Sequence, residues 1–142
     1  MSTYKFVIEA GLAYGPLERD IDWFSVLTDV AEERIEFAIL TEEGSGWFVQ
    51  AAAAGSDGTL VVEYQVRSSE GRLRHYRLCR PGLGDPGLKR RRSWWLGRKG
   101  YMEKERFDVL HAIEVFKSFV RSLNVPSTYE LNDIAAELGL ES

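Results

Sequence analysis

The sequence predicts an α+β fold: a single mostly antiparallel sheet of about five strands, two main helices and a short C-terminal helix. Two observations lead to this class. Segments with alternating apolar residues follow one another through the middle of the chain and are separated by short, glycine-containing turns. Segments with helical spacing of apolar residues stand before and after them, without the regular β–α alternation of a parallel sheet.

Residues 4–79 contain the predicted sheet and one helix. Asp20 or Asp22 can cap this helix, which we expect over residues 22–33 with Phe24 and Leu27 on its apolar face. Alternation and β-branched or aromatic content predict strands near residues 4–10, 35–40, 46–53, 59–67 and 72–79.

The second half begins with a long irregular stretch. Residues 80–103 contain two Pro-Gly dipeptides and three further glycines, which predict a long basic loop rather than a regular element. Apolar residues then recur at helical spacing over residues 104–123, and a short helix is expected near residues 131–138. The residues expected to be largely buried in the core are Phe24, Leu27, Val49, Val62, Tyr64, Ile113, Phe116 and Val120.

Length and composition indicate one soluble domain. The chain has 142 residues, of which 44% are hydrophobic and 28% are charged. We expect a single globular domain over residues 1–142, because a chain of this length can form a core without disulfides or metals. Its apolar runs are too short for a transmembrane helix, and its first residues lack the pattern of a signal peptide. With a single cysteine, Cys79, these features predict a cytoplasmic protein that does not enter a membrane.

Charge is strongly segregated along the chain. Residues 1–66 contain 12 acidic and 3 basic side chains, a local balance of −9. Residues 67–107 contain 13 basic and 4 acidic side chains, a balance of +9, and residues 108–142 return to −4. Such asymmetry is typical of a nucleic-acid surface, a surface for a partner protein, or two faces of one fold that neutralise each other.

The residues that could support catalysis are few. His75 and Cys79 would share one side of a strand but lie about 14 Å apart along it, too far for a dyad. His111 falls on the polar side of the second helix. The carboxylates Glu18 and Asp20, with Asp22, lack the spacing of a calcium loop and fit a helix start better. We therefore expect no enzymatic activity, no metal site and no cofactor.

The string KRRRSWWLGRKGYMEK carries six cations between Lys89 and Lys99. Cations can neutralise phosphates, and the aromatic side chains could stack on bases, so a nucleic-acid site is one interpretation. The same tryptophans could instead anchor a solvated loop to the sheet or contact a partner protein. The overall acidity of the chain argues against a general affinity for nucleic acids.

The string GWFVQAAAAGSDGTLVVEYQV, followed by RLRHYRL, resembles the central hairpins of Imm-type immunity proteins of bacterial polymorphic-toxin systems. The resemblance covers residues 47–78, and the helical segment AIEVFKSFV extends it more weakly. It implies a small cytoplasmic protein that binds and neutralises a cognate toxin domain, often one that attacks nucleic acid. It implies no enzyme and no cofactor.

The expected function is therefore that of a non-catalytic protein-binding inhibitor, an immunity protein whose partner is a toxin. Carboxylates could compete with phosphates for basic residues of such a toxin. Two alternatives stay open: a nucleic-acid-binding accessory domain that uses residues 89–101, and a small ligand-binding regulatory module. The candidate partner-binding residues are the acidic Glu42, Glu43, Asp57 and Glu63 and the basic or aromatic Arg90, Arg91, Arg92, Trp94, Trp95 and Tyr101.

Overall fold

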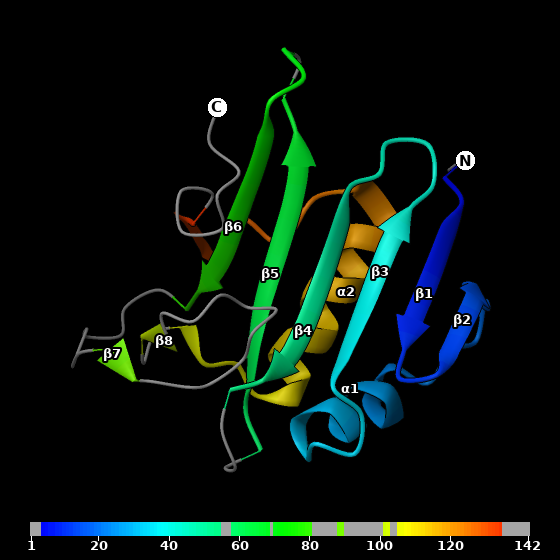
Figure 1. Ribbon diagram of the computed structural model, residues 1–142, viewed down its shortest axis with the longest axis vertical. Coiled ribbons are helices and arrows are strands. Elements are labelled where there is room, and N and C mark those ends of the chain that lie inside the picture. The colour runs from blue at the N-terminus through cyan, green and yellow to red at the C-terminus, as the bar shows by residue number, and fades with distance from the viewer. Residues whose placement is uncertain are drawn as a thin grey trace.

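The computed structural model describes residues 4–54, 58–68, 70–80, 88–89, 101–102 and 105–134. In this part of the chain, seven strands form one antiparallel sheet, and the helices α1 (Trp23–Ala31) and α2 (Val109–Ser122) lie on one face of it (Figure 1). The strands, in spatial order, are β2 (Ala13–Pro16), β1 (Phe6–Ala10), β3 (Phe37–Glu42), β4 (Phe48–Ala53), β5 (Leu60–Arg67), β6 (Leu73–Cys79) and β9 (Glu130–Asp133). The predicted α+β class with an antiparallel sheet is confirmed.

The predicted strand count of about five is wrong, because two further strands pair at the edges of the sheet. No strand was predicted at residues 13–16, but these residues pair with β1. Residues 130–133 pair with β6, where a short helix near residues 131–138 was expected, and residues 135–142 lie outside the described part. A neighbouring strand offers both segments hydrogen bonds, which outweigh their weak intrinsic preference for strand.

Most of the predicted 80–103 loop lies outside the described residues. Within it, β7 (Leu88–Lys89) and β8 (Tyr101–Met102) pair antiparallel as a separate two-stranded sheet. The expectation of a wholly irregular stretch is therefore corrected at these two places.

Both described helices begin at an aspartate. The Asp22 carboxylate accepts the backbone N–H of Ser25 at 3.0 Å, so the predicted cap of the first helix is confirmed for this residue. The Asp108 carboxylate accepts the N–H of His111 at 2.8 Å in the same way. The second helix ends at Ser122, and the following Leu123, with a left-handed φ of 60°, stops the helical hydrogen-bond pattern.

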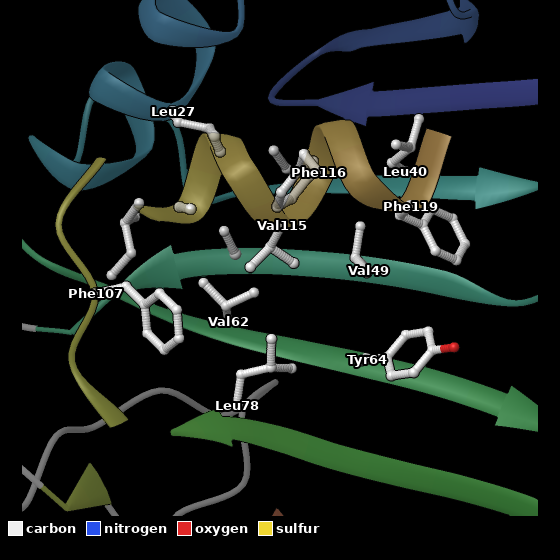
Figure 2. Close-up of a cluster of buried hydrophobic side chains, with 14 of the residues drawn as sticks. Leu27, Leu40, Val49, Val62, Tyr64, Leu78, Phe107, Val115, Phe116 and Phe119 are labelled. Atoms are coloured by element: carbon white, nitrogen blue, oxygen red, sulfur yellow. The ribbon is translucent and has the colours of Figure 1, made fainter. Parts of the chain in front are cut away.

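The core lies between the helices and the sheet. Figure 2 shows Phe116 and Phe119 of α2 directed toward the strands, where Val62 of β5 lies. The Tyr64 hydroxyl donates to the Leu123 carbonyl at 2.8 Å and so ties β5 to the end of α2. Neither helix among the described residues has the length and apolarity needed to cross a bilayer.

The predicted core is largely confirmed, with one error. Of the predicted core residues, Leu27, Val49, Val62, Tyr64 and Phe116 are buried, while Ile113 and Val120 are partly buried against the same core. Phe24, however, is 57% exposed. The neighbouring Trp23 takes the inward position instead and packs on Phe116, with ring centroids 5.3 Å apart. Consecutive helical residues differ by about 100° in direction, so only one of these two rings can face the core.

Candidate functional site

Two groups of polar side chains stand out in the described residues. The first, which we call the buried polar cluster, lies on the sheet face opposite the helices. It follows the strand register, because Gln50 of β4 stands opposite Glu63 of β5, which stands opposite Arg77 of β6, which stands opposite Asn132 of β9. The cluster consists of Gln50, Glu63, Gln65, His75, Arg77, Glu105 and Asn132.

Glu63 is the centre of this cluster. Its Oε1 accepts from Gln50 Nε2 at 2.9 Å and lies 2.6 Å from His75 Nε2. Its Oε2 accepts from Arg77 Nε at 3.2 Å and from Arg77 Nη2 at 3.1 Å. Glu63 is completely buried, so this candidate partner-binding residue is not on the surface that a partner would contact. A buried carboxylate requires such partners, because an unpaired charge in the interior is strongly unfavourable.

The cluster extends beyond Glu63 through a second carboxylate. Arg77 Nη1 lies 3.5 Å from Glu105 Oε1, and Asn132 Nδ2 donates to Glu105 Oε2 at 3.1 Å. His75 Nδ1 lies 2.8 Å from Gln65 Oε1. The cluster thus joins four strands and the segment that precedes α2, and it fixes their relative register.

The cluster contains an acid–base pair, but its groups face protein rather than solvent. His75 and Glu63 have side-chain exposures of 4% and 0%. Cys79 is also buried. His111 is exposed and its Nδ1 lies 2.7 Å from Asp108 Oδ1, so its contact belongs to the start of α2. In the part of the chain that the structure describes, no three His, Cys, Asp or Glu side chains are placed to hold a metal ion.

Glu42 also has a structural position. It is 6% exposed, and its carboxylate accepts the backbone N–H groups of Gly44 and Ser45, both at 2.8 Å. Burial acts to raise the pKa of this carboxyl, but these hydrogen bonds outweigh it and hold the pKa below the usual 4.5. Glu42 therefore builds the β3–β4 turn, which corrects its expected place on an exposed face, whereas Glu43 is exposed.

The remaining predicted site residues are not described in detail. Asp57, Arg90, Arg91, Arg92, Trp94 and Trp95 lie outside the described residues. Tyr101 is placed in β8 through its backbone. The structure brings Glu63 together with His75 and Arg77, and it does not place the acidic and basic candidate groups relative to each other.

The second group, which we call the acidic corner, surrounds α1. It comprises residues 17–36, which carry seven Asp or Glu and two Arg, a net charge of −5. The β1–β2 turn packs on it, because a Cβ added to Gly11 would lie 2.9 Å from Cγ2 of Ile35. Arg34 pairs with Asp29 at 2.7 Å and also with Glu32. The exposed carboxylates of the corner are Glu18, Asp20, Asp22, Glu32, Glu33 and Glu36.

Apolar side chains project into solvent beside these carboxylates. Leu12 in the β1–β2 turn is fully exposed, Tyr14 of β2 is 72% exposed, and Phe24 of α1 is 57% exposed. A pocket of about 390 Å³ lies between the β1–β2 hairpin and the start of α1, lined by apolar side chains and by Glu18. The sequence did not reveal this group, since its carboxylates fit a helix start, although its net charge of −5 in 20 residues was a usable signal.

No protein-family model, curated protein or solved structure matches this chain. The expected resemblance to Imm-type immunity proteins over residues 47–78 therefore stays a prediction.

Proposed function

We propose that this chain is a non-catalytic protein-binding inhibitor, an immunity protein that neutralises a cognate bacterial toxin domain. The acidic corner carries this proposal, because its exposed carboxylates and exposed Phe24 adjoin the exposed Leu12 and Tyr14 of the β1–β2 hairpin. Protein interfaces are built in this way, with a few large apolar side chains supplying affinity inside a polar rim.

The charge of the corner suits a basic partner. A toxin that acts on nucleic acid must offer cationic side chains to phosphates, and carboxylates of an inhibitor can occupy the same side chains. A net charge of −5 within residues 17–36 would also steer such a partner toward this end of the sheet.

The buried polar cluster supports the non-catalytic part of the proposal. Its titratable groups, Glu63, His75, Arg77 and Glu105, contact one another, and their side chains are each no more than 4% exposed. A general acid or base has to come within hydrogen-bond distance of a substrate. Groups that are buried in contacts with one another fit a role in fixing the strand register better than a role in such a reaction.

The alternative is a nucleic-acid-binding accessory domain that uses residues 89–101. The +9 balance of residues 67–107 favours it, and the overall charge of −4 argues against it. If the basic segment contacts phosphates, replacing Arg90, Arg91 and Arg92 by Ala should reduce the salt slope of binding by about 0.7 to 0.9 per lost contact.

The proposal predicts that a toxin domain is encoded beside the gene, and co-expression with that domain tests it directly. We expect the chain to restore growth and to co-purify with the toxin domain. The charge-reversed variant D20K/E36K should associate more slowly, and the difference should shrink as salt shortens the Debye length.

A matched control for this variant is E70K/E130K, which makes the same change in net charge at exposed positions outside residues 17–36. It should associate at nearly the rate of the unchanged chain. Absence of both growth rescue and a complex would contradict the proposal, and equal slowing by both variants would show that the acidic corner has no special role.

A further inference from the structure

We propose that the pocket between the β1–β2 hairpin and α1 receives one large apolar side chain of the partner protein, flanked in the partner by Lys or Arg. This inference rests on the proposed function, since it says how the acidic corner recognises its partner. It adds a binding site and the chemistry that fits it.

The pocket has apolar walls from three parts of the chain. Ile8 of β1 and Gly15 of β2 stand opposite each other in the strand register and line it together. Ile21, before α1, and Val26, within α1, line it from the helix side. Its volume of about 390 Å³ is at the lower end of the range for ligand sites. This volume is ample for one aromatic or branched side chain.

The surroundings of the pocket favour cations. Glu18 is exposed and belongs to the lining, and Asp20 is exposed two residues further along the same loop. The corner as a whole carries a net charge of −5. A partner residue that enters the pocket therefore brings its flanking residues close to carboxylates, which selects Lys or Arg on either side of it.

The apolar surface continues outside the pocket. Tyr14 lines the pocket and is nevertheless 72% exposed, and Leu12 is fully exposed in the adjoining turn. A small molecule seated in the pocket would leave Leu12 in solvent. A protein partner that reaches along the hairpin would also cover Leu12, as the neighbours of an interface anchor are normally covered.

The backbone of β2 is poorly suited to bind a partner as an added strand. The Leu17 N–H donates to the Phe6 carbonyl at 3.0 Å, so the backbone groups of Leu17 face β1. In an antiparallel pair the backbone groups of successive residues alternate in direction, so those of Tyr14 and Pro16 point away from β1. Proline has no N–H, which leaves Tyr14 to supply the outward backbone donor of this four-residue strand. Side-chain insertion is therefore the mode of recognition that this edge permits.

Gly15 allows the pocket to be filled without disturbing the fold. A Cβ added at this position meets no atom within 4 Å, and its φ is outside the left-handed region. Residues opposite each other in an antiparallel pair point to the same face, so a side chain at position 15 would lie beside Ile8 in the pocket. The variant G15L should fold as the unchanged chain does, and thermal unfolding checks this.

Short peptides test the pocket without the toxin. The probe is acetyl-Lys-Trp-Lys-amide, and the controls are acetyl-Lys-Ser-Lys-amide and acetyl-Glu-Trp-Glu-amide. We expect the probe alone to shift the methyl NMR signals of Ile8, Ile21 and Val26, and G15L to abolish the shift. E18Q should weaken the affinity for the probe peptide by about 1.4- to 5-fold, as expected for the loss of one exposed ion pair. No shift, or equal shifts by all three peptides, would overturn the inference.

The toxin complex separates this inference from the proposed function. G15L should weaken the complex by at least about 30-fold, as the loss of an interface anchor does. If G15L binds the toxin normally while D20K/E36K binds slowly, the pocket inference is wrong and the proposed function stands. If tryptamine shifts the same methyl signals and G15L leaves the toxin complex unchanged, the pocket is a small-amine site, which also overturns the inference. If no complex forms at all, the proposed function fails and the peptides alone decide the pocket.

Discussion

Replacing Glu63 by Gln should destabilise the protein severely, although the two side chains have nearly the same shape. Four hydrogen bonds converge on the Glu63 carboxylate, and all of them are donated by neighbours. A glutamine amide accepts at one oxygen and places an NH₂ donor where the other oxygen was. That donor must then face either Arg77 or the pair formed by Gln50 and His75.

The expected loss is about 3–5 kcal/mol, the usual effect of breaking a buried ion pair from one side. Arg77, at 3% exposure, would lose its hydrogen bonds to a charged Glu63 and keep its contact with Glu105, at 3.5 Å. Domains of this size are typically stable by about 5–15 kcal/mol, so the variant would lose a large share of the total. The exposed E70Q should change stability by less than about 0.5 kcal/mol.

Urea unfolding followed by tryptophan fluorescence measures this loss, because Trp23 is buried against Phe116 and becomes exposed on unfolding. The double variant E63Q/R77M should lose less stability than the sum of its two single variants, by about 0.5–3 kcal/mol. A loss below about 1 kcal/mol for E63Q, with additive single effects, would refute the reasoning that this cluster is tightly coupled.

Three further predictions concern the core and two titrating groups. F116A should lose about 3–5 kcal/mol in the same urea assay, because Phe116 is completely buried. Because the pKa of Glu42 is lower in the folded protein, the ionised carboxylate stabilises the fold above pH 4.5, and this stabilisation is lost as the pH falls through the folded-state pKa. The difference in unfolding free energy between the unchanged chain and E42Q, measured by urea unfolding, should therefore become smaller below pH 4.5. Burial, together with the nearby Tyr76, raises the pKa of Tyr64 to about 12. Unfolded tyrosine titrates near 10, so stability should fall between about pH 10 and 12, and Y64F should lack this part of the loss in parallel unfolding curves.

The central strands could be predicted from the sequence because one of their faces meets the helices. In β5, Val62 and Tyr64 face the core, and this alternation gives the strand within one residue at its first end. The edge strand β2 could not be predicted, because its residues AYGP have little preference for strand and pair only where β1 offers hydrogen bonds.

The candidate site was harder to predict because burial depends on register. Alternation correctly places Glu63 on the face opposite Val62, but it does not show that Glu63 is buried on that face. Arg77 stands opposite Glu63 only because of the β5–β6 register, and Glu105 arrives from a segment 42 residues later in the chain. No local pattern around Glu63 contains this information.

The acidic corner was missed for a different reason. Asp22 caps α1, so the interpretation of these carboxylates as a helix start is correct for Asp22. The exposure of Leu12 and Tyr14, which turns a charged loop into a candidate interface, is a property of the folded hairpin. Turn residues give no sign in the sequence of whether they will be covered.

The late position of β9 in the chain has a consequence for synthesis. Residues 80–129 separate β6 from β9, its neighbour in the sheet. At about 5–20 residues per second, a ribosome needs about 3–10 s to produce this stretch. During that time β9 is not yet available to pair with the outer backbone edge of β6, and Glu105, which contacts Arg77, is added about halfway through the stretch. During this period the open edge of the nascent chain can pair with strands of other chains. The speed of translation through these residues should therefore influence how much protein is recovered in soluble form.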